Sequence, residues 1–118
     1  MDPKTYEGSC HCGAVRYEAK FALGEALSCN CSICSRLGAL RTFVPGADFK
    51  LLSGADNLAD YQFAKQHIHH VFCKTCGVHS FARGKKPDGE EVFAVNLRCL
   101  AGIDPDALPV KKFDGKAL

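Results

Sequence analysis

The sequence predicts an all-β sandwich or open barrel made of short strands. Apolar and polar side chains alternate with period two in several segments, whereas helical spacing is confined to two short stretches. Turn residues such as Pro45-Gly46, Ser53-Gly54 and Pro87-Asp88-Gly89 separate the alternating segments. The 118 residues, of which 47% are hydrophobic, have the size of one domain with a modest core. We therefore expect a single domain over residues 1–118.

The first expected strand directly follows the first pair of cysteines. Over 15–20, Val15, Tyr17 and Ala19 alternate with charged residues, which predicts a strand with one buried face. Further strands are expected, in chain order, over 40–44, 49–52, 60–64, 68–72, 78–82 and 92–97.

Two of these strands flank a pair of cysteines, and two short helical turns are also expected. The strands over 68–72 and 78–82 flank Cys73 and Cys76, so we expect a hairpin with these cysteines at its tip. Helical turns are expected over 32–37 and over 104–108, where a proline suits the first turn of the second.

Composition and charge exclude several classes of partner. A net charge of +2 is too small to indicate binding to nucleic acid or to an acidic membrane surface. No stretch approaches the roughly 18 apolar residues that a membrane-spanning helix needs. Met1-Asp2-Pro3-Lys4 lacks the apolar core of a signal peptide, so we expect a cytoplasmic protein. The sequence does not indicate an oligomeric state.

Seven of the eight cysteines lie in three short clusters. In a strand, residues i and i+2 point to the same side, so thiols in Cys-x-Cys can bind one ion. A tight turn brings the thiols of Cys-x-x-Cys together in the same way, and such spacings are typical of zinc sites. The clusters are Cys10-His11-Cys12, Cys29-Asn30-Cys31-Ser32-Ile33-Cys34 and Cys73-Lys74-Thr75-Cys76.

Two alternatives to zinc explain the cysteines less well. A disulfide framework suits an oxidising compartment, and Cys-x-Cys pairs are poorly placed to bridge each other. An iron–sulfur cluster also takes four cysteines, but the familiar ferredoxin spacings are absent.

Neighbouring glycines divide the thiols between two zinc ions. Gly13 follows the first cluster and Gly77 the third, where a positive φ would turn the glycine amide towards a thiolate sulfur. The two glycine-marked pairs together supply the four thiolates of a closed, structural zinc site. We assign this site to Cys10, Cys12, Cys73 and Cys76.

The remaining cluster provides Cys29, Cys31 and Cys34 for a second zinc ion. Three protein ligands keep the fourth position open for water or substrate, as in catalytic zinc sites. The alternative is a fourth protein ligand, for which Cys99 and His79 are the candidates. Cys99 has apolar neighbours, so we expect it to pack as a small hydrophobic residue.

The histidines have no assigned role. On the strand expected over 68–72 and its approach, His67 and His69 share one face and His70 takes the other. His11 lies inside the first cluster, where its ring could hydrogen-bond a thiolate. Neither these residues nor His79 is expected to be a catalyst.

The clusters and their neighbours resemble the glutathione-dependent formaldehyde-activating enzyme family. The likeness runs from about residue 6 to 115, where we expect the core of the domain. It implies a mainly β domain of the β-tent type with short antiparallel strands, two zinc ions, and the same division of the cysteines. The matching segments are SCHCGAV at 9–15, CNCSIC at 29–34, FCKTCGVH at 72–79, VNLRCL at 95–100 and FDG at 113–115.

The resemblance also implies a reaction. It is that of a zinc-dependent carbon–sulfur lyase like S-(hydroxymethyl)glutathione synthase, which adds a thiol such as glutathione to a small aldehyde such as formaldehyde. Arg36, Arg41, Lys65 and Arg83 are candidates to bind the carboxylates of glutathione. The alternative is a zinc-stabilised binding module without chemistry, as in related domains such as that of centromere protein V.

Overall fold

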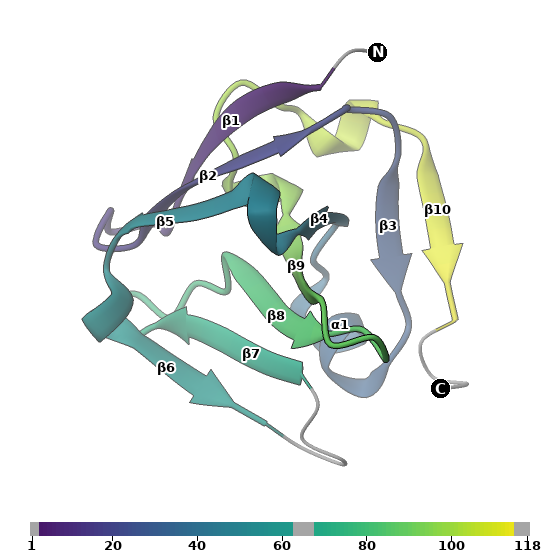
Figure 1. Ribbon diagram of the computed structural model, residues 1–118. Helices are drawn as coiled ribbons and strands as arrows, with labels where there is room; N and C mark the ends of the chain where they lie inside the picture. The colour runs from purple at the N-terminus through teal and green to yellow at the C-terminus, as the bar shows by residue number, and fades with distance from the viewer. Residues whose placement is uncertain (1–2, 63–67, 115–118) are drawn as a thin grey trace.

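Two β-sheets make up the computed structural model, which describes residues 3–62 and 68–114 (Figure 1). The smaller sheet has the strand order β1-β2-β5, and the larger has the order β10-β3-β4-β9-β8-β7-β6. The strands are β1 Lys4–Ser9, β2 Arg16–Phe21, β3 Ala26–Cys29, β4 Arg41–Pro45, β5 Phe49–Ser53, β6 Leu58–Tyr61, β7 Ile68–Cys73, β8 Phe81–Lys85, β9 Glu91–Asn96 and β10 Val110–Phe113.

Neighbouring strands run antiparallel, apart from β10 and β3, which pair in parallel. In Figure 1 the smaller sheet lies above β6, β7 and β8, and the pair β3–β10 stands to one side. The predicted mainly β fold of short antiparallel strands is therefore confirmed.

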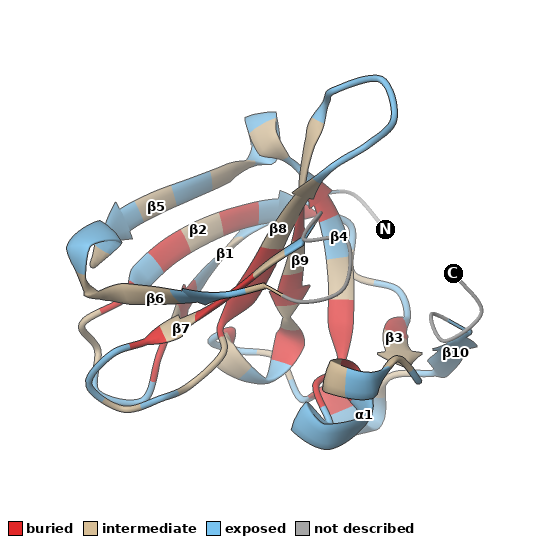
Figure 2. Cartoon of the chain, turned by 90° about the horizontal axis from the view of Figure 1, so that it is seen from below, coloured by how far each residue is buried: buried red, intermediate tan, exposed pale blue. Residues whose placement is uncertain are grey.

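The core lies between the two sheets and is built on stacked aromatic rings. Phe49 stacks on Phe93 with ring centroids 4.0 Å apart and an angle of 7° between the planes. Tyr17 is fully buried, with its ring 5.3 Å from that of Phe49, and its hydroxyl donates to the Ser80 carbonyl at 3.3 Å. Figure 2 shows the buried residues concentrated on β2, β4, β7, β8 and β9. These contacts hold the smaller sheet against the larger one.

One α-helix and four 3₁₀ turns connect the strands among residues 3–62 and 68–114. The helix α1 spans Ser32–Leu37, as predicted, and ends at Gly38, whose φ of 65° needs a residue without Cβ. The 3₁₀ turns are η1 Gly46–Asp48, η2 Ala55–Asn57, η3 Leu97–Cys99 and η4 Pro105–Ala107. None of the described helices is long and apolar enough to cross a membrane.

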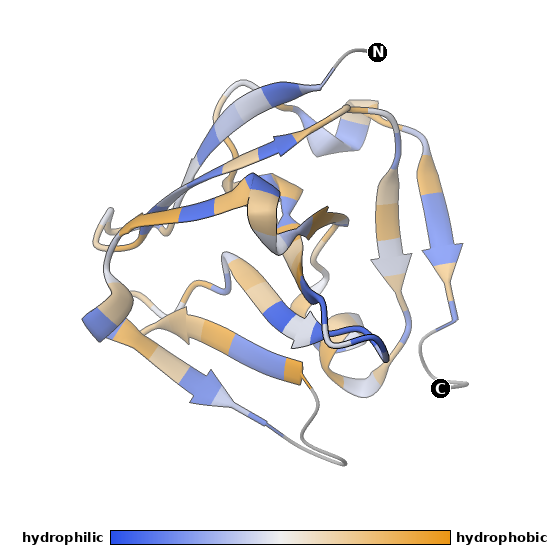
Figure 3. Ribbon diagram, in the orientation of Figure 1, coloured by the Kyte–Doolittle hydropathy of each residue, from blue (hydrophilic) through white to orange (hydrophobic). Residues whose placement is uncertain are grey.

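Most expected strands are present, with shifted ends. The strand predicted over 78–82 is wrong in position, because β8 begins at Phe81. The Val78 carbonyl accepts from the Cys73 amide at 3.1 Å and so closes a turn instead of joining a sheet. The strand predicted over 60–64 is β6, Leu58–Tyr61, and residues 63–64 lie outside the described part. The predicted polar turn near residue 88 separates β8 from β9 (Figure 3).

Three strands, β1, β3 and β10, were not predicted, and the second helical turn is shorter than expected. The turn expected over 104–108 is η4, in which the Asp104 side chain accepts from the Asp106 amide. The strand β3 ends at Cys29, so it delivers the second cysteine cluster to the beginning of α1.

Candidate metal centres

The structure brings four thiols of the first and third clusters together. The Sγ atoms of Cys10, Cys12, Cys73 and Cys76 all lie within 4.8 Å of one another. Cys10 and Cys73 are buried, and the distances Cys10–Cys12 and Cys12–Cys73 are both 3.6 Å between sulfurs. Zinc–sulfur bonds of about 2.3 Å at tetrahedral angles place neighbouring sulfurs roughly 3.8 Å apart. The four thiols therefore fit one tetrahedral ion.

Two turns with similar hydrogen bonds present these thiols. The Cys10 amide donates to the Val15 carbonyl and the Cys73 amide to the Val78 carbonyl, both at 3.1 Å. Each turn then closes on a glycine with positive φ, 83° at Gly13 and 78° at Gly77, as the sequence indicated. The similar turns explain why two distant segments offer matching pairs of sulfurs.

The expected role of the two glycine amides is wrong. Gly13 donates to the Cys10 carbonyl at 3.3 Å and Gly77 to the Cys73 carbonyl at 2.8 Å, so neither bond is to a sulfur. The Cys10 sulfur instead accepts from the Val15 amide at 3.3 Å. The glycine conformation is needed to tighten each turn, and the following residues supply the amide that reaches the thiol.

Asn57 is a neighbour of this site that the sequence did not reveal. Its Nδ2 lies 3.3 Å from the Cys73 sulfur and 3.1 Å from the Thr75 hydroxyl oxygen, and it can donate to both. The Lys74 amide donates to the Asn57 carbonyl at 2.8 Å. The turn η2 thus holds the third cluster through side chain and backbone. No pattern in the sequence links this asparagine to the cysteines.

The hydrogen bonds give the four thiols unequal acidities in the absence of metal. The Cys12 and Val78 amides lower the pKa of Cys76 to about 6. The Ala14 amide acts to lower the pKa of Cys12, but burial and the neighbouring thiols outweigh it and raise that pKa to about 11. A metal ion therefore displaces a proton from Cys76 more readily than from Cys12.

The second cluster forms a separate group of three thiols. The Sγ atoms of Cys29, Cys31 and Cys34 lie within 4.8 Å of one another. Cys29 ends β3, Cys31 precedes the first residue of α1, and Cys34 is buried one turn later. The Cys31 amide lies 3.5 Å from the Cys29 sulfur and can donate to it. A strand end and the first turn of a helix thus place the three sulfurs on one point.

The three thiols also differ in acidity. Burial, followed by the hydrogen bond with the Cys31 thiol, raises the pKa of Cys34 to about 12. Burial acts to raise the pKa of Cys31 as well, but hydrogen bonds with the Cys34 amide and thiol outweigh it and lower that pKa. Three thiolates at this point suit a soft or borderline cation, so this group could hold a second metal ion.

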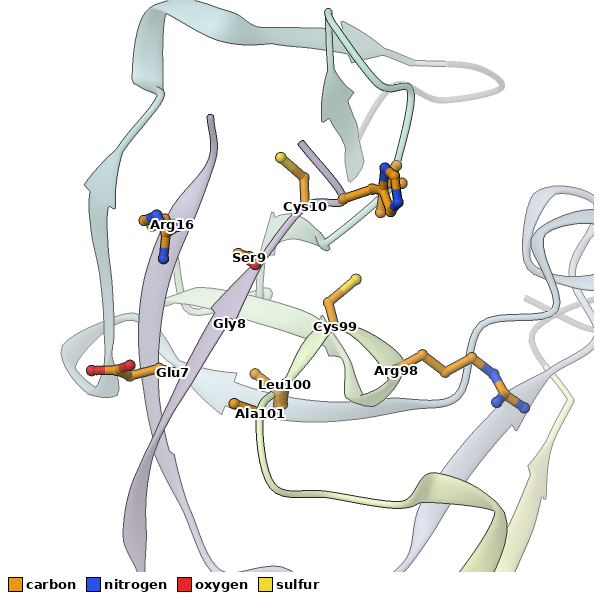
Figure 4. A pocket seen from close by; sticks show the side chains of 11 residues that line it. Glu7, Gly8, Ser9, Cys10, Arg16, Arg98, Cys99, Leu100 and Ala101 are labelled. Carbon is orange, nitrogen blue, oxygen red and sulfur yellow. The ribbon is translucent and has the colours of Figure 1, made fainter. Parts of the chain in front are cut away.

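The candidates for a fourth ligand, Cys99 and His79, do not join this group. Within the described residues, the group contains only the three cysteines. Cys99 instead lines a pocket of about 410 Å³ beside Cys10, on the side of the four-thiol group (Figure 4). Burial raises the pKa of the Cys99 thiol. The His79 ring lies 5.0 Å from the Phe72 ring, between centroids.

None of the other described histidines belongs to either thiol group. His69 Nδ1 is 2.5 Å from an oxygen of Asp60, at the surface. His70 is buried, and burial and the charge of Arg41 lower its pKa. His11 is exposed, and His67 lies outside the described residues.

The four cations that the sequence offered for the carboxylates of glutathione lie in different surroundings. Arg36 is exposed and donates to the Ser32 carbonyl at 2.7 Å, and Arg83 Nη1 lies 3.9 Å from an oxygen of Glu91. Lys65 lies outside the described residues. Arg41 is the exception, because only 5% of it is exposed.

Comparison with known proteins decides the family. A model of the glutathione-dependent formaldehyde-activating enzyme family matches residues 5–112. The chain belongs to this family. A Rhodobacter sphaeroides protein of known crystal structure has 34% sequence identity to this chain. The two structures are similar with a TM-score of 0.76, and the match covers 89% of this chain and 99% of that one. The family predicted from the three cysteine clusters is therefore confirmed.

Proposed function

We propose that this member of the glutathione-dependent formaldehyde-activating enzyme family is a zinc-dependent carbon–sulfur lyase. It adds a thiol such as glutathione to a small aldehyde such as formaldehyde, or catalyses the reverse reaction. The observation that carries this proposal is the group Cys29, Cys31 and Cys34, which no fourth His, Cys, Asp or Glu joins among residues 3–62 and 68–114. An ion held by three thiols has room for a substrate sulfur.

The proposal assigns two zinc ions to each chain, with different tasks. Cys10, Cys12, Cys73 and Cys76 hold a closed, structural ion, which agrees with their 3.6 Å sulfur spacings. Cys29, Cys31 and Cys34 hold the second ion. A zinc ion there favours the thiolate form of a substrate thiol and orients its sulfur.

The reaction itself is an addition to a carbonyl group. The thiol sulfur forms a bond to the aldehyde carbon, the π pair of the carbonyl moves to oxygen, and that oxygen takes the proton lost by the thiol. Three cysteinates and a dication carry a net charge of −1, which favours holding a nucleophile over polarising a carbonyl. The end of β3 at Cys29 and the first turn of α1 bring the three sulfurs together at one point.

Zinc K-edge absorption with and without glutathione tests this function. We expect glutathione to add a sulfur at about 2.3 Å to the second ion, and to leave the first unchanged. The Cys31→Ser variant, which we expect to lack the second ion, is the control and should show no change. An unaltered spectrum for the wild-type protein, or a fourth protein ligand in a metal-loaded structure, would favour the non-catalytic binding module.

A further inference from the structure

Arg41 is a buried cation without a carboxylate partner in the described part of the chain. It is 5% exposed at the beginning of β4, and its Nη1 donates to the Ala94 carbonyl at 3.2 Å. Its Nε has no hydrogen-bond partner among the described residues. The ion pairs formed by residues 3–62 and 68–114 involve other cations. Burying a charge without a counter-charge is costly, so Arg41 needs an anion.

The sheet register places Arg41 beside the three-thiol group. Arg41 pairs with Leu27 of β3, two residues before Cys29. Side chains directly opposite each other, and those two residues apart, lie on the same side of a sheet, so Cys29 and Arg41 share one side. The short helix that carries Cys34 is joined to β4 by Gly38, Ala39 and Leu40. Both elements that supply the three thiols therefore adjoin Arg41.

The positive charge of Arg41 reaches the buried Cys34 side chain of that group. The nearby imidazoles of His70 and His79 have lowered pKa values, through burial first and the charge of Arg41 second. Neutral imidazoles do not compete with Arg41 for an anion, and the thiols that its charge reaches are those of Cys34 and Cys99.

We propose that Arg41 is the counter-charge of the three-thiol site. Three thiolates and Zn²⁺ have a net charge of −1, and the guanidinium brings the assembly to zero. Arg41 acts through the thiolates, so it is a positioning residue and not a ligand. This inference rests on the proposed binding of zinc by Cys29, Cys31 and Cys34.

Metal affinity provides a test that does not depend on turnover. Zinc retained per chain is measured against increasing chelator, and the Cys31→Ser variant identifies the transition that belongs to the second site. We expect Arg41→Met to weaken that site on the order of 10- to 100-fold, and Arg41→Lys to restore most of the affinity. Arg36→Met, which removes an exposed charge two residues from Cys34, should change the affinity less than about twofold. Arg41→Gln replaces Arg41→Met if the latter does not fold.

An unchanged affinity in Arg41→Met or Arg41→Gln overturns the inference while the proposed function stands. An equal loss in Arg41→Lys also overturns it, because hydrogen-bond geometry and not charge would then be required. A wild-type protein that holds no second zinc ion instead removes the proposed function itself.

A second experiment distinguishes a role of Arg41 as counter-charge from a role in binding the substrate. The protein with Co²⁺ in the second site is titrated with 2-mercaptoethanol and with mercaptoacetate, and the sulfur-to-cobalt absorption reports binding. A counter-charge predicts that Arg41→Met weakens both thiols by similar factors. If only mercaptoacetate is weakened, Arg41 binds the carboxylate of the substrate, and the inference is wrong.

Discussion

The sulfurs of Cys12 and Cys73 lie 3.6 Å apart although 61 residues separate them in sequence. Cys12 lies in the turn between β1 and β2 of the smaller sheet, and Cys73 ends β7 of the larger sheet. An ion held between them therefore joins the two sheets at one edge, in addition to the aromatic contacts of the core.

Cys73→Ser should unfold the protein. Structural zinc contributes on the order of 10–16 kcal/mol, whereas a whole domain is stable by only about 5–15 kcal/mol. Cys73 is also 1% exposed, so its replacement leaves a buried hydroxyl beside the three remaining cysteines. Circular dichroism during thermal unfolding, together with the zinc content, measures the effect. A variant that melts within a few degrees of the wild type would contradict the structural assignment of this site.

Cys31→Ser should lose the second zinc ion and retain the fold. Cys31 precedes α1 at one edge of the larger sheet, and it contributes nothing to the aromatic core between the sheets. We expect zinc per chain to fall from about two to about one, because a site with two thiolates binds zinc weakly. Far-ultraviolet circular dichroism should stay close to that of the wild type. Unfolding as complete as in Cys73→Ser would show that the two sites do not have separate roles.

Cys99→Ala should leave both zinc ions and the binding of thiols intact. Cys99 is half-buried in the wall of the pocket beside Cys10, apart from the three-thiol group. The cost should be the loss of one packed sulfur, about 1 kcal/mol of unfolding free energy. Zinc content and the cobalt absorption in the presence of glutathione are the measurements. Loss of one zinc ion would identify Cys99 as a ligand.

Gly54→Ala should destabilise the fold by about 2 kcal/mol or more. Gly54 has a φ of 91°, and a Cβ there would lie 2.4 Å from the Ala14 carbonyl oxygen and 2.8 Å from the Val15 Cα. The matched control is Gly24→Ala, whose Cβ would meet no atom within 4 Å, and which should change stability by less than about 0.5 kcal/mol. Denaturant unfolding of both variants checks the difference. Equal stabilities would contradict the close approach at Gly54.

The helix over Ser32–Leu37 was predictable from local sequence, whereas β1 was not. Gly38 can take the positive φ that ends α1, so residues next to the helix determine where it ends. In β1 the one buried position is Gly8, where a Cβ would lie 2.4 Å from the Tyr17 ring. The ring of another strand fills the space that a side chain of β1 would occupy. Period-two hydrophobicity therefore does not reveal this strand.

The two cysteine groups were also predictable from residues close together in sequence, whereas the residues that surround these groups were not. Thiols two or three residues apart must converge, and matching glycines paired the first cluster with the third. Asn57 reaches Cys73 from a turn 16 residues away, so only the tertiary structure shows its contact. The burial of Arg41 likewise depends on elements that pack around β4, and its own neighbours do not reveal it.

The parallel pairing of β3 with β10 has a consequence for the order in which the protein matures. Phe113 lies opposite Cys29, the Asn30 amide donates to the Phe113 carbonyl at 3.2 Å, and Asn30 Nδ2 donates to Asp114 at 2.8 Å. The strand that carries Cys29 thus gains its outer neighbour only after residue 114 has been synthesised and has left the ribosome. The four cysteines of the other group have all been made by residue 76. During translation the four cysteines whose ion would join the sheets therefore emerge before the strand that completes the edge beside the three-thiol group.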